Sequence, residues 1–113
     1  MRCGTERRVG KVTILDVAGQ VMLGNVETEV TERIRGHLRD GQRAFLLNLD
    51  AVTSIDSHGL GDLVAAHEAA SQEGATVKLL NVRPRVREPL RVMNLLKFFE
   101  MFESEAEAVT SFS

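Results

Sequence analysis

AFLLNL, at residues 44–49, is a short and nearly continuous apolar run in the middle of the chain. A strand that is buried on both faces of a parallel sheet has this pattern, because neither of its faces meets water. TVKLL, at residues 76–80, reads as a second strand, and a helical stretch separates the two. Together the three segments predict a βαβ unit with parallel strands and a right-handed crossover.

The residues on the N-terminal side of this unit predict a hairpin. KVTILDV, at residues 11–17, carries β-branched residues and reads as a strand. Residues 9–10 read as a turn, so residues 2–8 are expected to pair with this strand as a short edge strand.

A first helix is expected from Asn25 to Arg39, with Asn25 as its N-cap and Gly41 as its stop signal. Four apolar residues recur every four positions and would form its buried stripe. They are Val26, Val30, Ile34 and Leu38.

A second helix is expected to begin at Asp56-Ser57 and to run to about Gln72. Its inner stripe would consist of Leu60, Leu63, Val64, His67 and Ala70.

A third helix is expected within residues 84–96. Pro89 lacks a backbone N–H, so the regular helix is expected to start near Glu88 or to bend there. The inner stripe of this helix would be Val86, Leu90, Met93 and Leu96. A last strand at residues 98–102 and a helix at residues 104–112, capped by Ser104 with Glu107 as its capping-box partner, complete the chain.

This order of elements predicts an α/β fold, with a central mixed sheet of four or five strands and about four helices. With 113 residues, the chain is expected to form one domain over residues 1–113. The composition, 43% hydrophobic and 27% charged, is that of a globular protein. It contains five Phe and neither Trp nor Tyr, and its net charge is −2, so we expect no nucleic-acid partner.

The sequence favours a reducing compartment. Cys3 is the only cysteine, which excludes an internal disulfide. No apolar run approaches the ~20 residues that span a bilayer, and the N-terminus has no apolar signal core. We expect a cytoplasmic protein, or one domain of a larger assembly, without membrane insertion.

One stretch is locally basic. It contains Arg83, Arg85, Arg87 and Arg91, partly offset by Glu88. Either a solvated helix face or a docking patch accounts for it.

The most distinctive motif is IDSHGLG at residues 55–61, where a buried strand gives way to a helix. Gly59 and Gly61 in a first helical turn each cost about 1 kcal/mol relative to alanine. Such a cost is tolerated where a partner or a phosphate must approach the backbone. The positive helix end could hold a phosphate on Ser57, although Asp56 or Ser57 could equally be an ordinary N-cap.

Enzyme chemistry finds little support. Ser57 and His58 are adjacent at a helix start and would point about 100° apart, which is poor geometry for a nucleophile and its base. His37, His58 and His67 do not have the spacing of a metal site, and no phosphate-binding glycine loop occurs. We therefore expect no enzyme, no cofactor and no metal.

The run LLNLDAVTSIDSHGLG, with the later KLLNV and ESEAEAVTSF, resembles the STAS domains, and within them the bacterial anti-sigma-factor antagonists. The resemblance extends over nearly the whole chain. It implies a sheet covered on one side by helices, with Ser57 as the phosphoacceptor. It also implies a partner that is both an anti-sigma factor and a serine kinase using ATP, and a serine phosphatase that resets the switch.

One position and one segment depart from the family pattern. His58 stands where Ser or Thr is common, and residues 19–24 replace an acidic loop that helps to contact the kinase.

The expected partner surface consists of the residues around Ser57 and of residues in the loop before the first helix. Its candidate residues are Asp56, His58, Gly59, Leu60, Gly61, Asp62, Met22, Leu23 and Asn25. We expect a monomer or a weak dimer. The alternative function is a STAS scaffold that is never phosphorylated, as a subunit of a sensory complex or a regulatory part of a lipid or anion transport system.

Overall fold

The computed structural model describes residues 2–18 and 29–113. Its strands are β1 (Arg2–Val9), β2 (Val12–Ala18), β3 (Ala44–Ala51), β4 (Thr76–Leu80) and β5 (Met101–Phe102). Its helices are α1 (Glu29–Arg39), α2 (Ser57–Gln72), α3 (Pro84–Val92) and α4 (Glu105–Thr110), with a short 3₁₀ turn, η1 (Leu96–Phe98).

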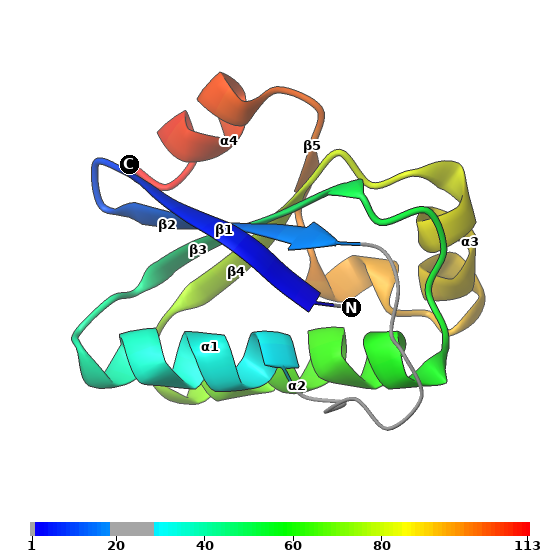
Figure 1. The fold of residues 1–113 in the computed structure, drawn as a ribbon, viewed down its shortest axis with the longest axis horizontal. Coiled ribbons are helices and arrows are strands. Elements are labelled where there is room, and N and C mark those ends of the chain that lie inside the picture. The colour runs from blue at the N-terminus through cyan, green and yellow to red at the C-terminus, as the bar shows by residue number, and fades with distance from the viewer. Residues whose placement is uncertain (1, 19–28) are drawn as a thin grey trace.

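The strands form one mixed sheet in the order β1-β2-β3-β4-β5 (Figure 1). β1 is antiparallel to β2, and the other neighbours are parallel. The predicted mixed sheet with about four helices is therefore confirmed, and so are the N-terminal hairpin and the parallel βαβ unit.

The position of β3 in the sheet explains the nearly continuous apolar run AFLLNL. Alternate side chains of a strand point to opposite faces. Phe45, Leu47 and Leu49 face the main core under α1 and α2, whereas Ala44 and Leu46 face a second apolar cluster. All five side chains are buried.

Helices cover both faces of the sheet. α1 and α2 lie against one face and α4 against the other (Figure 1). The expectation of a sheet covered on one side is therefore wrong for this chain. The second face carries Ile14, Leu46 and Leu80, and their apolar surface is covered by Ala108 of α4 and by Phe112.

Lys78 fixes the C-terminal segment to the sheet. Its ammonium group donates to the carbonyl oxygen (3.1 Å) and hydroxyl (2.9 Å) of Ser111. It also lies 3.2 Å from a Glu100 oxygen and 4.5 Å from the centre of the Phe112 ring. The buried charge is thus compensated by an anion, an aromatic face and two oxygen acceptors.

α3 differs from its prediction at both ends. It begins at Pro84, which suits a first turn, and it contains Pro89 without interruption. Asn94 adopts a left-handed φ of 60° and ends the helix, so Met93 is exposed instead of lying on an inner stripe. The last strand is also shorter than predicted, because Phe98 belongs to η1.

Asp16 joins three strands and, through Arg7, the last helix. Its carboxylate accepts hydrogen bonds from Arg7 Nε (2.9 Å), Thr5 Oγ1 (2.7 Å) and Asn48 Nδ2 (2.9 Å). Arg7 also pairs with Glu105 of α4 at 2.8 Å. The Arg7 guanidinium, helped by the other donors, lowers the pKa of Asp16 to about 2.

Replacing Asp16 by Asn should change how stability depends on pH. The folded pKa lies below the unfolded value, so the stabilisation is complete above about pH 4 and is lost as the pH falls towards 2. Partial exposure limits it to roughly 1–2 kcal/mol. Urea unfolding near neutral pH should show this loss for Asp16→Asn, whereas Asp40→Asn, at an exposed site, should match wild type. Equal pH dependence of the wild-type and Asp16→Asn free energies would contradict the assignment.

Candidate functional site

The N-terminus of α2 is capped by Asp56. This residue is extended (φ −104°, ψ −175°), and its Oδ1 accepts a hydrogen bond from the Gly59 N–H at 2.9 Å. Its carbonyl accepts the Leu60 N–H at 2.9 Å, the first bond of the helix. The Gly59 N–H holds the pKa of the Asp56 carboxyl below its usual range. Of the two candidate caps in the sequence, the structure therefore selects Asp56.

Ser57 is consequently not needed as a cap. It is the first residue of α2 and is exposed, and no hydrogen bond links its hydroxyl to any residue that the structure describes. His58 beside it is exposed as well. Gly61 is exposed, and a Cβ added there would meet no atom from another part of the described chain within 4 Å. Asp56, Ser57, His58 and Gly61 form what we call the Ser57 surface.

Two other predicted partner residues are not fully exposed. Gly59 is buried, and Leu60 is partly buried and packs against the main core together with Ile55. These apolar contacts hold the start of α2 on the sheet. The motif therefore combines residues that anchor the helix with residues that are exposed to solvent.

Asp62 is buried, so its expected place on an exposed docking surface is wrong. Its carboxylate accepts hydrogen bonds from the backbone N–H groups of Val30 and Thr31, each at 2.9 Å. The Thr31 hydroxyl lies 2.7 Å from Asp62 Oδ1 and donates to it. These donors belong to the first turn of α1, whose positive end favours a carboxylate. Asp62 thus binds α2 to the start of α1.

Arg83 anchors the segment that leads to Ser57. Its Nε donates to the carbonyl of Asp50 at 2.6 Å, and its Nη2 lies 3.5 Å from the Asp50 carboxylate. Asp50 lies near the end of β3, so this contact connects α3 with the loop before α2. In the sequence, the basic stretch that begins at Arg83 was a weak indication of this contact.

Three predicted partner residues, Met22, Leu23 and Asn25, lie outside the described residues, as does Val26 of the first helical stripe. The remaining members of that stripe, Val30, Ile34 and Leu38, are buried as predicted.

A family model described as "STAS domain" matches residues 6–108 of the chain. The chain belongs to the STAS family. No curated protein matches it.

Several solved structures share the fold of this STAS domain. A putative anti-sigma factor antagonist from Thermotoga maritima is 24% identical, with a TM-score of 0.83 over 95% of this chain and 92% of its own. The Bacillus cell fate determinant SpoIIAA in its phosphorylated form is 17% identical, with a TM-score of 0.75 over 96% and 98% of the two chains. SpoIIAA in its unphosphorylated form is 18% identical, with a TM-score of 0.72 over 96% of this chain and 94% of its own.

A sulfate transporter family protein from Wolinella succinogenes is also similar in structure. It is 21% identical, with a TM-score of 0.71 over 91% of this STAS domain and 85% of that chain. At these identities the likeness establishes the fold, and function must be argued from the residues.

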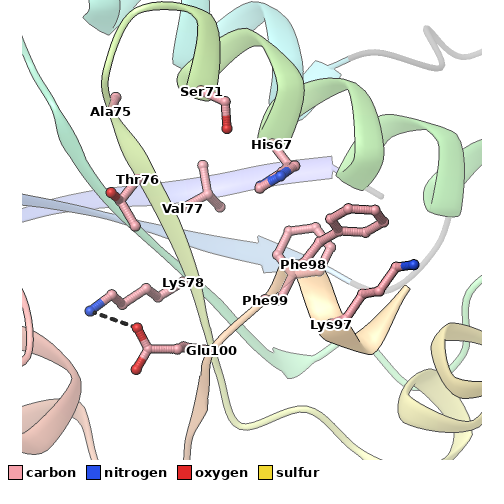
Figure 2. A pocket seen from close by; sticks show the side chains of 10 residues that line it. All are labelled: His67, Ser71, Ala75, Thr76, Val77, Lys78, Lys97, Phe98, Phe99 and Glu100. Atoms are coloured by element: carbon pink, nitrogen blue, oxygen red, sulfur yellow. Dashed lines mark ion pairs between the residues drawn. The ribbon is translucent and has the colours of Figure 1, made fainter. Parts of the chain in front are cut away.

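A hollow of about 250 Å³ lies away from the Ser57 surface, between α2, β4 and the segment after α3 (Figure 2). His67 lines it, with the rings of Phe98 and Phe99 both centred 5.4 Å from its own. His67 is therefore a packing residue of the STAS domain. In the described ranges, no group of three or more His, Cys, Asp or Glu residues could hold a metal ion, and no helix is long and apolar enough to cross a membrane.

Asp62→Ala should destabilise this STAS domain strongly. The substitution leaves two backbone N–H groups of α1 without their acceptor in a buried place, which should cost about 3 kcal/mol. Chemical denaturation would measure it, with Glu68→Ala, an exposed position of the same helix, as the control. If the two variants unfolded at the same denaturant concentration, the joining role of Asp62 would be refuted.

Proposed function

We propose that this STAS domain is an anti-sigma-factor antagonist whose switch is the phosphorylation of Ser57. In the unphosphorylated state it binds an anti-sigma factor that is also a serine kinase. Phosphorylation by that kinase releases the complex, and a serine phosphatase restores the binding state.

The observation that carries the proposal is the exposed hydroxyl of Ser57, which forms no hydrogen bond with the residues that the structure describes. Asp56 provides the helix cap, and Leu60 and Ile55 provide the anchoring contacts. Ser57 contributes to neither, although it lies at the exposed start of the helix. A kinase could reach its oxygen without disturbing the fold. In the transfer, Ser57 Oγ would form a bond to the γ-phosphorus of ATP, ADP would leave, and the hydroxyl proton would pass to a base on the kinase.

The phosphate would act through charge and bulk. The Asp56 carboxylate already occupies the Gly59 N–H, so the new group would add roughly −1.5 to −2 charges beside an existing negative charge. A partner that covers the Ser57 surface would then lose packing and meet repulsion. The chain is about equally similar to SpoIIAA in its phosphorylated and unphosphorylated forms, which supports a switch without refolding.

A second candidate is a scaffold or regulatory STAS domain of a transport or sensory system, in which Ser57 is never modified. The structural similarity to a sulfate transporter family protein supports this second candidate. The two candidates differ in whether Ser57 ever carries phosphate.

Intact mass of the protein purified from its native host separates them. Wild type should show a species heavier by about 80 Da, the mass of one phosphate group, and Ser57→Ala should lack it. Ser54→Ala, in the exposed loop before the helix, is the matched control and should still gain the increment. An increment that survives in Ser57→Ala would refute the site. Its absence from wild type in every growth and stress condition would favour the scaffold.

Gly61→Ala should separate stability from recognition. Its Cβ has free space, so the helix should gain up to about 1 kcal/mol from alanine's propensity. The added methyl group should nonetheless obstruct a partner that approaches the backbone, and the phosphorylated fraction in the host should fall severalfold. Gly36→Ala in α1 is the control, because its Cβ would meet only an Arg39 side-chain atom at 3.9 Å. Unchanged phosphorylation of Gly61→Ala would show that no partner packs closely there.

A further inference from the structure

Exposed apolar side chains are concentrated at the end of α3. Val92 is 65% exposed, Met93 60% and Phe98 44%. Among the described residues only Val9 is another large apolar side chain with comparable exposure. Grouped exposed apolar residues commonly mark interaction sites.

The chain turns sharply between Val92 and Phe98. Asn94 takes the left-handed conformation, and the Leu95 N–H donates to the Leu90 carbonyl at 2.8 Å. This bonding closes the end of the helix and brings η1 into contact with α3.

The same region is strongly basic. Only Val86 and Leu90 of α3 are buried, and the arginines point to solvent. Arg85 and Arg87 form no ion pair with any residue in the described part of the chain, whereas Arg91 pairs with Glu88. Residues 83–98 contain five basic residues and one acidic residue, although the whole chain has a net charge of −2. The rest of the chain therefore has a negative net charge, and two of its acidic residues, Glu103 and Glu107, line a hollow together with Arg87.

This region lies at the same end of the molecule as the Ser57 surface (Figure 1). α3 lies at the end of the molecule where α2 begins (Figure 1). Arg83 holds the loop before α2 through Asp50. The Phe98 ring lies farther along α2, beside His67 (Figure 2). One partner could cover both regions at once.

We propose that these residues form a docking surface, the α3 surface, for a protein partner whose contact face is acidic around an apolar centre. The α3 surface comprises Arg85, Arg87, Arg91, Val92, Met93 and Phe98. Arg, Met and Phe are enriched in protein interfaces, whereas Lys is depleted. The free arginines call for carboxylates, and arginine can bind them with two parallel hydrogen bonds. The proposal goes beyond the switch at Ser57, because it requires no phosphate.

Site-specific photo-crosslinking in the native host tests it. A photoreactive residue in place of Met93 should yield one dominant protein adduct, and mass spectrometry should identify the protein and show that its crosslinked peptide is acidic. The same residue in place of Arg39, at the far end of α1, should not yield this adduct. The double variant Arg85→Glu/Arg87→Glu should reduce the adduct at least about tenfold, as expected for several lost charge contacts. The control Arg35→Glu/Arg39→Glu should change it less than about twofold.

Binding of the identified protein, once purified, should follow the same pattern. Its affinity for wild type should fall with added salt, and more steeply than its affinity for the Arg85→Glu/Arg87→Glu variant. Thermal melting should show that both double variants remain folded, because the four arginines are solvent-accessible. The control should melt slightly lower than wild type, because Arg39 lies in the last turn of α1, where a negative charge is unfavourable.

Three results would overturn the proposal. They are the absence of a protein adduct at Met93 in every growth condition, an adduct to lipid, and a protein adduct that is insensitive to charge reversal. Ser57→Ala in the same background keeps the two proposals separate. An adduct that persists while Ser57 never carries phosphate would retain the α3 surface and reject the switch.

Discussion

The carboxylate of Asp62 joins the two helices beneath the sheet. It is buried, and the hydrogen bonds that the structure gives it come from uncharged donors at the positive end of α1. A buried charge is retained only where such donors replace its lost water. The bonds therefore fix the start of α1 against the first turns of α2. They also help to fix the orientation in which the start of α2 presents Ser57 to solvent. The exposed switch candidate depends on a buried anion five residues later.

Much of the fold could be predicted from pattern alone. AFLLNL has apolar side chains on both faces because each face of β3 has its own core, and few other elements produce that run. The hairpin followed from β-branched residues beside a turn, the parallel unit from two apolar runs separated by a helical stretch, and the stripe of α1 from a period of four residues. The local pattern of strand, loop and two glycines marked residues 55–61 as distinctive but left Asp56 and Ser57 as alternative N-caps, and the resemblance to the STAS family singled out Ser57.

The features that could not be predicted depend on partners far along the chain. Asp62 looks like a solvent-facing acid until Val30 and Thr31, more than thirty residues earlier, are brought to it. Lys78 likewise interrupts an apolar strand without visible reason until Ser111 and Phe112 return over the sheet. Met93 fits a helical stripe, but the left-handed turn at Asn94 ends the helix just before the stripe would bring it inward.

The ion pair between Arg7 and Glu105 connects the first strand with the last helix. β1 is an edge strand and α4 is short, so each on its own would be among the first parts of the domain to fray. Because Asp16 and Glu105 share one guanidinium, opening either element exposes charges that the other was neutralising. Opening of either element should therefore destabilise the other by up to about 1 kcal/mol, and amide hydrogen exchange in β1 should respond to a change in the packing of α4.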